Sequence, residues 1–138
     1  MVHALKEAHR ILEPHGIIVD VRPLSIDVPL EVIYKGGNES AGMIDMSPGR
    51  PIDLAADQAV DTVIIDQLFT ESMIEYFYFT YYWTTMEGME EDIEENWKDE
   101  IIIPVEVGQR AHMLINQQRL ETQIRFAARM KLGIYVKL

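Results

Sequence analysis

The sequence contains no cysteine, which excludes disulfide bonds, thiolate metal sites and a cysteine nucleophile. It also has few basic residues, with 12 lysines and arginines against 23 aspartates and glutamates, and a net charge of −11. Because an acidic surface repels phosphate backbones, we expect no nucleic-acid partner. No apolar run approaches the roughly 18–20 residues that a membrane span needs, and the charged, helix-like N-terminus is not a signal peptide. We therefore expect a cytoplasmic protein without a membrane partner.

The sequence does contain enough apolar residues for a folded core, at 48% of the chain, and we expect one domain over residues 1–138. Helical spacing of apolar residues predicts a helix at 2–13. Gly16 is expected to take the left-handed conformation of the turn that follows. The short β-branched run at 17–21 predicts a strand that is covered on both faces and ends before Pro23.

The rest of the chain predicts a hairpin, three helices and two long strands. They are a hairpin at 28–35 and 41–46 around Gly36-Gly37-Asn38, a helix at 54–69 with Asp53 as its N-cap, an aromatic strand at 72–84, a helix that Thr84 and Glu87 begin as a capping box, and a helix near 104–119. Residues 123–138 then alternate, with apolar residues at even positions and several basic residues at odd positions. This alternation predicts a long strand with one buried and one solvated face.

This order of elements, together with "ALKEAHRILEPHGIIVDVRPLS" at 4–25, resembles the C-terminal half of a class I S-adenosylmethionine-dependent methyltransferase. In that family a helix that ends in a phrase like "E..R.L.PGG" leads into the fifth strand. The matching residues are Glu7, Arg10, Leu12, Pro14 and Gly16, with His15 where glycine is commoner. The resemblance implies an α/β fold with a partial Rossmann-like methyltransferase sheet. That sheet would be mixed, flanked by helices, with an antiparallel C-terminal hairpin and an inserted β-hairpin.

The cofactor site of that family does not carry over to this sequence. The family needs a glycine-rich turn after its first strand and an acidic residue at the end of its second strand. No GxGxG occurs here, and Gly36-Gly37 lies inside the predicted hairpin. The resemblance therefore implies no cofactor-binding residue in this chain, and S-adenosylmethionine only if a partner supplies the missing half. We expect a protein that is inactive alone.

An incomplete sheet also predicts a partner. In a full methyltransferase the fourth strand pairs with one edge of the strand at 17–21. Without it, that edge would present unpaired backbone groups, and such edges pair with other chains. Each large apolar side chain left exposed beside it costs about 1.5–3 kcal/mol. We expect either a two-fold homodimer, the commonest solution, or a complementary N-terminal methyltransferase half.

Candidate substrate-binding residues are Asp20, Arg22 and Tyr82. Asp20 and Arg22 stand at the C-terminal end of the predicted strand, where open α/β sheets bind their ligands. Tyr82 belongs to the aromatic strand. The structural alternative for the first two is an Asp–Arg ion pair or a hydrogen bond within a turn, because an aspartate within an apolar strand needs a partner. A further alternative is an independent enzyme with a pocket near Asp20 and Arg22.

The aromatic strand favours a second class of function. Residues 74–83 would serve a non-enzymatic interaction or scaffold protein as its interface. The structural alternative is a strand with core side chains on one face and interface side chains on the other. The four histidines lack a metal-site spacing, and the acidic run at 90–100 lacks the glycine of a calcium loop. We therefore predict no metal site, and no nucleophile motif identifies a catalytic residue.

Overall fold

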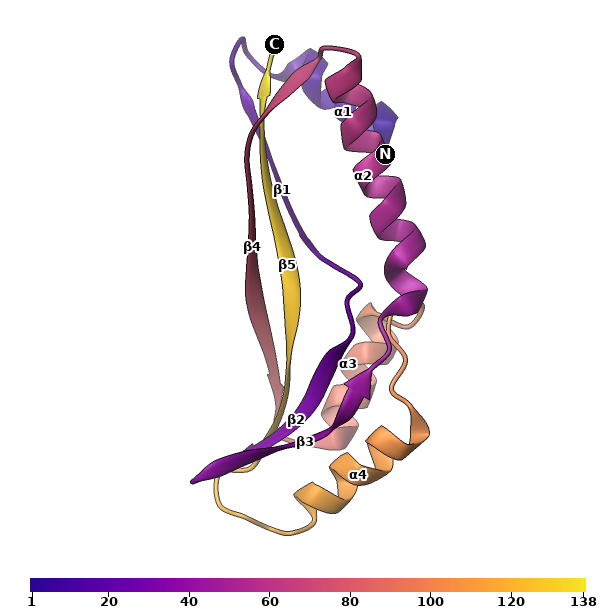
Figure 1. Cartoon of the computed structure of the whole chain (residues 1–138), viewed down its shortest axis with the longest axis vertical. Coiled ribbons are helices and arrows are strands. Elements are labelled where there is room, and N and C mark those ends of the chain that lie inside the picture. Colours follow the sequence, from indigo (N-terminus) through magenta and orange to yellow (C-terminus); the bar gives the residue numbers. More distant parts are fainter. The chain divides into compact units, whose positions relative to one another are not determined.

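The computed structural model describes all residues, 1–138, and Figure 1 shows the order of their helices and strands. The elements are α1 (Val2–Ile11), β1 (Ile17–Pro23), β2 (Val28–Tyr34), β3 (Gly37–Ile44), a 3-10 turn (Ser47–Gly49), α2 (Arg50–Ile65), β4 (Phe69–Trp83), α3 (Met86–Asn96), α4 (Val105–Ile115) and β5 (Gln123–Lys137). The strands form a five-stranded antiparallel sheet in which β5 pairs with β1, β2 and β4, and β2 pairs with β3. The fold is thus α/β, with antiparallel neighbours where a mixed sheet was expected.

The chain groups into two compact units. Unit 1 comprises Met1–Leu24, Pro51–Phe77 and Arg129–Leu138, and unit 2 comprises Ser25–Arg50 and Tyr78–Ala128. The long strands β4 and β5 each contribute one segment to both units. The predicted hairpin insert lies in unit 2, whereas the segment that resembles a methyltransferase lies almost wholly in unit 1.

Unit 1 places α1 and α2 on one face of its three strands. Val63, Phe69 and Tyr135 form its buried apolar cluster, and partly buried side chains of α1, including Val2 and Leu5, pack against it. β1 pairs with β5 in a regular register from Ile17–Val136 to Pro23–Met130. Because side chains alternate along a strand, Ile18, Asp20 and Arg22 share the face that the helices cover.

The prediction that β1 is covered on both faces is wrong. Ile17, Val19 and Val21 are 53%, 52% and 52% exposed. The helices cover only the opposite face, and β1 stands at the end of the strand order with β5 as its one neighbour. A β-branched apolar run is typical of a buried strand, but here half of its side chains remain uncovered.

The long strand β5 changes its buried face along its length. Ile124, Phe126, Ala128 and Met130 are buried, as the alternation predicts. Beyond them the buried residues are the odd-numbered Gly133 and Tyr135, and this part of the prediction is wrong. In unit 1 the helices cover the odd-numbered face, and a long twisted strand can turn different faces toward its helices. The half-buried apolar side chains that result are Leu132, Ile134 and Val136.

Unit 2 encloses the larger core, built from β2, β3, α3, α4 and its segments of β4 and β5. The rings of Tyr81, Trp83 and Trp97 surround Phe126, with centroid distances of 5.3, 5.4 and 6.2 Å from its ring. Trp83 Nε1 donates a hydrogen bond to Asp92 Oδ2 at 2.9 Å. Burial, together with the nearby charge of Asp92, raises the pKa of Tyr81.

Two local predictions are corrected by the backbone. The left-handed residue after α1 is His15, with φ of 63°, and not Gly16. Position 16 requires a glycine because a side chain has no room there: a Cβ would lie 2.9 Å from the carbonyl oxygen of Glu13. The cap of α3 is Thr85, whose Oγ1 accepts a hydrogen bond from the Gly88 amide, rather than Thr84.

The helix predicted from residue 54 begins earlier. α2 starts at Arg50, directly after the 3-10 turn, so that Asp53 lies in its first turn and is not its N-cap. Pro51 permits this start because a proline in the first turn loses no helical hydrogen bond. Asp53 remains favourable there, since an acidic side chain stabilises the N-terminal end of the helix dipole.

Candidate functional site

The structure joins Asp20 and Arg22 in the ion pair that the sequence suggested as their structural role. Arg22 Nε donates a hydrogen bond to Asp20 Oδ2 at 3.1 Å. Both side chains stand on the helix-covered face of β1, two residues apart, and the Arg22 side chain is 13% exposed. A guanidinium this well covered requires hydrogen-bond acceptors on several sides.

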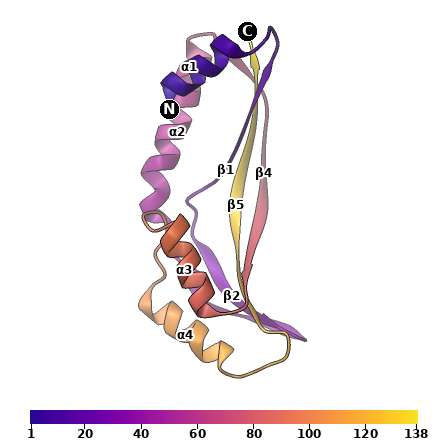
Figure 2. The ribbon, with the colours of Figure 1, turned by 180° about the vertical axis from the view of Figure 1, so that it is seen from behind.

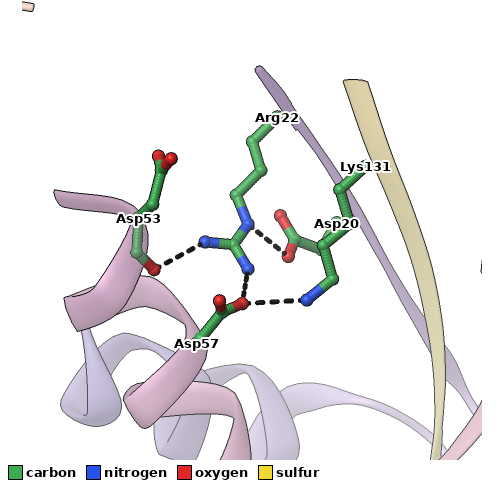
Figure 3. A network of polar contacts seen from close by, with 5 residues as sticks. All are labelled: Asp20, Arg22, Asp53, Asp57 and Lys131. Carbon is green, nitrogen blue, oxygen red and sulfur yellow. Dashed lines mark hydrogen bonds and ion pairs between the residues drawn. The ribbon is translucent and has the colours of Figure 1, made fainter. Parts of the chain in front are cut away.

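Helix α2 supplies the other acceptors (Figure 3). Arg22 Nη1 donates to the backbone carbonyl of Asp53 at 3.1 Å, and Nη2 donates to Oδ1 of Asp57. Lys131 of β5 donates from Nζ to the same Asp57 oxygen at 2.8 Å. The Arg22 network, defined here as Asp20, Arg22, the Asp53 carbonyl, Asp57 and Lys131, therefore ties α2 to β1 and β5.

Asp57 and the two cations that share it, Arg22 and Lys131, stabilise each other's charged forms. Burial alone would raise the pKa of Asp57, but hydrogen bonds from Lys131 and Arg22 outweigh it and hold that pKa below its ordinary value. Burial would likewise lower the pKa values of Arg22 and Lys131, and their interactions with Asp57 raise them instead. All three pKa values are shifted away from neutral pH, whereas a general acid or base works best with a pKa near neutral pH. The network therefore fits a structural role.

A cavity of about 240 Å³ lies beside this network in unit 1. α1 contributes Ala4 to its wall, α2 contributes Ala56 and Ala59, and β1 contributes Val19 and Asp20. The cavity is mostly apolar, and the alanines leave space between the helices and the strand. Tyr135 also lines the cavity, and burial raises the pKa of its hydroxyl group.

The edge of β1 that faces away from β5 is open. Gly16 O accepts a hydrogen bond from the Lys137 amide, and the Leu24 amide donates to Arg129 O, both at 2.8 Å. Hydrogen-bonded residues alternate along an antiparallel pair. The residues between Gly16 and Leu24 with even numbers therefore point their backbone groups at β5. The odd-numbered Ile17, Val19 and Val21 point theirs at the open edge.

Sequence reasoning missed Asp57 and Lys131. A buried arginine on a strand demands more than one acceptor, so the need for a further acid could have been anticipated. The chain has 23 acidic residues, however, and only the packing of α2 selects Asp57. Lys131 lies opposite Arg22 in the register of β1 and β5, which the sequence does not specify.

Tyr82 belongs to unit 2, whereas Asp20 and Arg22 belong to unit 1. Tyr82 is 51% exposed, and its hydroxyl group interacts with Arg125. Arg125 Nη2 in turn donates to Glu31 Oε2 at 2.8 Å. Tyr82 thus takes part in a polar contact of its own unit, and its role in substrate binding stays a prediction.

The structure contains no group of three or more histidine, aspartate or glutamate side chains arranged to hold a metal ion. His9 packs edge-on against Phe69, with ring centroids 5.4 Å apart, and His112 Nε2 lies 3.5 Å from a Glu90 carboxylate oxygen. None of the α-helices combines the length and the apolar character that crossing a bilayer would require. Comparison of the chain with protein-family models, with curated proteins and with solved structures found no match.

Proposed function

We propose that this chain is a methyltransferase-like half domain, inactive alone, which a partner completes along the open edge of β1. One observation carries the proposal: Ile17, Val19 and Val21 present unpaired backbone groups at that edge and apolar side chains that are half exposed. An open edge is a template for pairing with another chain, and exposed apolar side chains are unfavourable in water. The partner is a second copy of the chain or a separate N-terminal methyltransferase half, in the cytoplasm.

Two features of unit 1 support the methyltransferase part of the proposal. α1 leads through the turn at His15 directly into β1, in the order that the phrase at 4–25 implies. The strand β5 lies between β1 and β4, which agrees with an antiparallel C-terminal hairpin placed next to the family's fifth strand. If the partner is an N-terminal methyltransferase half, that half would bind S-adenosylmethionine, since no glycine-rich turn occurs in this chain.

Isothermal titration of the purified chain with S-adenosylmethionine tests this proposal. We expect no binding by the chain alone, because its residues do not supply the cofactor turn. Tight binding by the isolated chain would contradict the proposal and favour an independent enzyme. Light scattering distinguishes the two possible partners. A homodimer has twice the mass of one chain, whereas a monomeric chain would mean that the partner is a different polypeptide.

A second candidate is an interaction or scaffold protein that uses the aromatic strand. The observation that favours this candidate is the exposure of aromatic side chains on β4: Phe79 is 50% exposed and Tyr82 is 51% exposed. Exposed aromatic residues are enriched at protein interfaces. If the chain associates, loss of association in Phe79→Lys but not in Val19→Lys favours this candidate. The reverse result favours the open edge of β1.

A further inference from the structure

We infer that the cavity of unit 1 binds a small neutral molecule that combines an apolar body with one hydroxyl group, such as a phenol. The inference goes beyond the proposed function, because this site needs neither a partner chain nor S-adenosylmethionine. Two observations carry it: a buried tyrosine hydroxyl group without a partner, and the position of that group beside a carboxylate on an apolar wall.

The register of β1 and β5 brings the two polar groups of the cavity together. Asp20 of β1 pairs with Gly133 of β5, and Tyr135 follows two residues later on the same face of β5. A Cβ at Gly133 would lie 2.6 Å from the Tyr135 hydroxyl oxygen, so this oxygen lies over the glycine. Gly133 therefore leaves the space that places the tyrosine hydroxyl group next to Asp20, and both Asp20 and Tyr135 line the cavity.

The hydroxyl group of Tyr135 has no partner within the protein. Tyr135 is 4% exposed, and its hydroxyl group makes no hydrogen bond to another residue. Every side-chain polar atom that is sealed from solvent does have a partner, so this hydroxyl group is reachable by a water-sized molecule. A buried tyrosine hydroxyl group usually finds a hydrogen-bond partner. Because Tyr135 lines the cavity, an acceptor on a bound molecule would supply that partner.

Asp20 offers the complementary acceptor. Its Oδ2 atom accepts the hydrogen bond from Arg22 Nε at 3.1 Å, and its Oδ1 atom accepts none from the protein. Burial raises the pKa of Tyr135, and the charge of Asp20 adds to that effect, so the tyrosine keeps its proton and can donate it. A ligand hydroxyl group is both a donor and an acceptor. It can therefore donate to Asp20 and accept from Tyr135 at the same time.

The charges around the cavity favour a neutral ligand. Two cations, Arg22 and Lys131, are paired with two carboxylates, Asp20 and Asp57, so these four side chains carry no net charge. An ammonium or carboxylate group on a ligand would add an unbalanced charge beside an apolar wall, which is costly. A hydroxyl group makes the same contacts without adding charge.

The size and wall of the cavity set the apolar body of the ligand. Ala4 of α1 and Ala56 and Ala59 of α2 leave the space, and Figure 2 shows these helices on the same side of β1. The volume is about 240 Å³, whereas an apolar cavity of about 150 Å³ in another protein binds benzene. Pockets for drug-sized molecules begin at roughly 300 Å³. The cavity therefore fits a single ring with a hydroxyl group and one further small substituent.

Titration of the isotope-labelled full chain with p-cresol, followed by NMR, tests the inference. We expect saturable shifts at the amides of Asp20 and Gly133 and at the methyl group of Ala56, and none at Met113 of unit 2. Toluene, which lacks only the hydroxyl group, should bind about tenfold more weakly, because it makes neither hydrogen bond. Benzoate and benzylamine, which are charged, should also bind at least about tenfold more weakly than p-cresol.

Variants of the chain separate the hydroxyl contact from the cavity itself. Tyr135→Phe removes a hydroxyl group that has no partner in the protein, so the fold should persist, and p-cresol should lose about fivefold in affinity while toluene loses none. Tyr76→Phe is the matched control, because Tyr76 is 50% exposed and does not line the cavity. Ala56→Leu fills the cavity and should weaken both ligands at least about tenfold. Thermal unfolding of each variant verifies that it is folded.

Three results would overturn the inference. They are the absence of saturable shifts with p-cresol up to its solubility limit, toluene that binds as tightly as p-cresol, and p-cresol binding that both Tyr135→Phe and Ala56→Leu leave unchanged. None of these results would contradict the proposed function, which fails instead if the chain alone binds S-adenosylmethionine tightly.

Discussion

The two units bury their apolar residues to very different degrees. Unit 1 contributes only Ala59, Val63, Phe69, Met130 and Tyr135 to the buried apolar residues, and all the others belong to unit 2. Helix α1 has a clear apolar face, yet none of its residues is buried. Unit 2 therefore has a closed core, whereas unit 1 is open on one face and along one edge.

The strand β5 shows that the two units differ in burial because of how the sheet is covered, and not because of their composition. Its even-numbered residues are apolar throughout, but they are buried only as far as Met130. In unit 1 the same alternation leaves Ile134 and Val136 half-buried, next to the exposed Ile17 and Val19 of β1. Apolar residues of this kind on a sheet face are those that a partner would bury.

The largest expected effect comes from the core of unit 2. Phe126→Ala should lower the free energy of unfolding by about 3–5 kcal/mol, because the removed ring leaves a cavity among three aromatic side chains. Urea titration followed by tryptophan fluorescence measures this change. Both tryptophans, Trp83 and Trp97, lie in unit 2 and contact the Phe126 ring.

Met113→Ala is the matched control within unit 2. Met113 lies on α4 and is 58% exposed, so its truncation should change the free energy of unfolding by no more than about 0.5 kcal/mol. A cost below about 1 kcal/mol for Phe126→Ala would contradict a closed core in unit 2.

The next effect concerns the Arg22 network of unit 1. Asp57→Asn leaves Arg22 and Lys131 without their shared carboxylate and should cost about 1 kcal/mol, since Asp57 is 44% exposed and solvent screens part of the interaction. Thermal unfolding followed by circular dichroism measures the change. Asp66→Asn, which breaks the exposed pair of Asp66 and Lys6, should stay within about 0.5 kcal/mol. Equal effects of the two variants would show that the network is no more than a surface pair.

The same network predicts a dependence on pH. The folded pKa of Asp57 is lowered, so its contribution is present above the unfolded value of about 3.9 and is lost as the pH falls through the folded pKa. The folded pKa of Lys131 is raised, so its contribution is present below about 10.4 and is lost as the pH rises through the folded pKa. The stability difference between the natural chain and Asp57→Asn should therefore shrink from pH 7 to pH 3. A difference that grows toward pH 3 would have the wrong sign.

The smallest effect is expected at the open edge. Val19→Thr should change the free energy of unfolding of the isolated chain by no more than about 0.5 kcal/mol, because Val19 is half exposed and threonine suits a strand. Val63→Thr, in the core of the same unit, should cost about 1–3 kcal/mol for the buried hydroxyl group. Thermal unfolding of the two variants measures the contrast, and a large cost at Val19 would mean that the chain itself covers this face.

The sequence predicted the order of the elements and offered the pair of Asp20 and Arg22 as one structural alternative, because local periodicity and the demand of a charged group for a partner are properties of short segments. It did not predict which face of β1 or β5 is covered, since alternation identifies two faces but not the position of the helices. For the same reason, the sequence did not identify Asp57 as the further acceptor for Arg22. Its role depends on where α2 packs, and the sequence sets that only through the whole fold.

Amide hydrogen exchange along β1 in the monomeric chain distinguishes an open edge from a covered one, residue by residue. We expect alternating protection, with slow exchange at Ile18, Asp20 and Arg22, whose amides bond to β5. Ile17, Val19 and Val21 should exchange much faster, because their amides face solvent at the open edge. Equally strong protection of both sets in the monomeric chain would contradict an open unit 1.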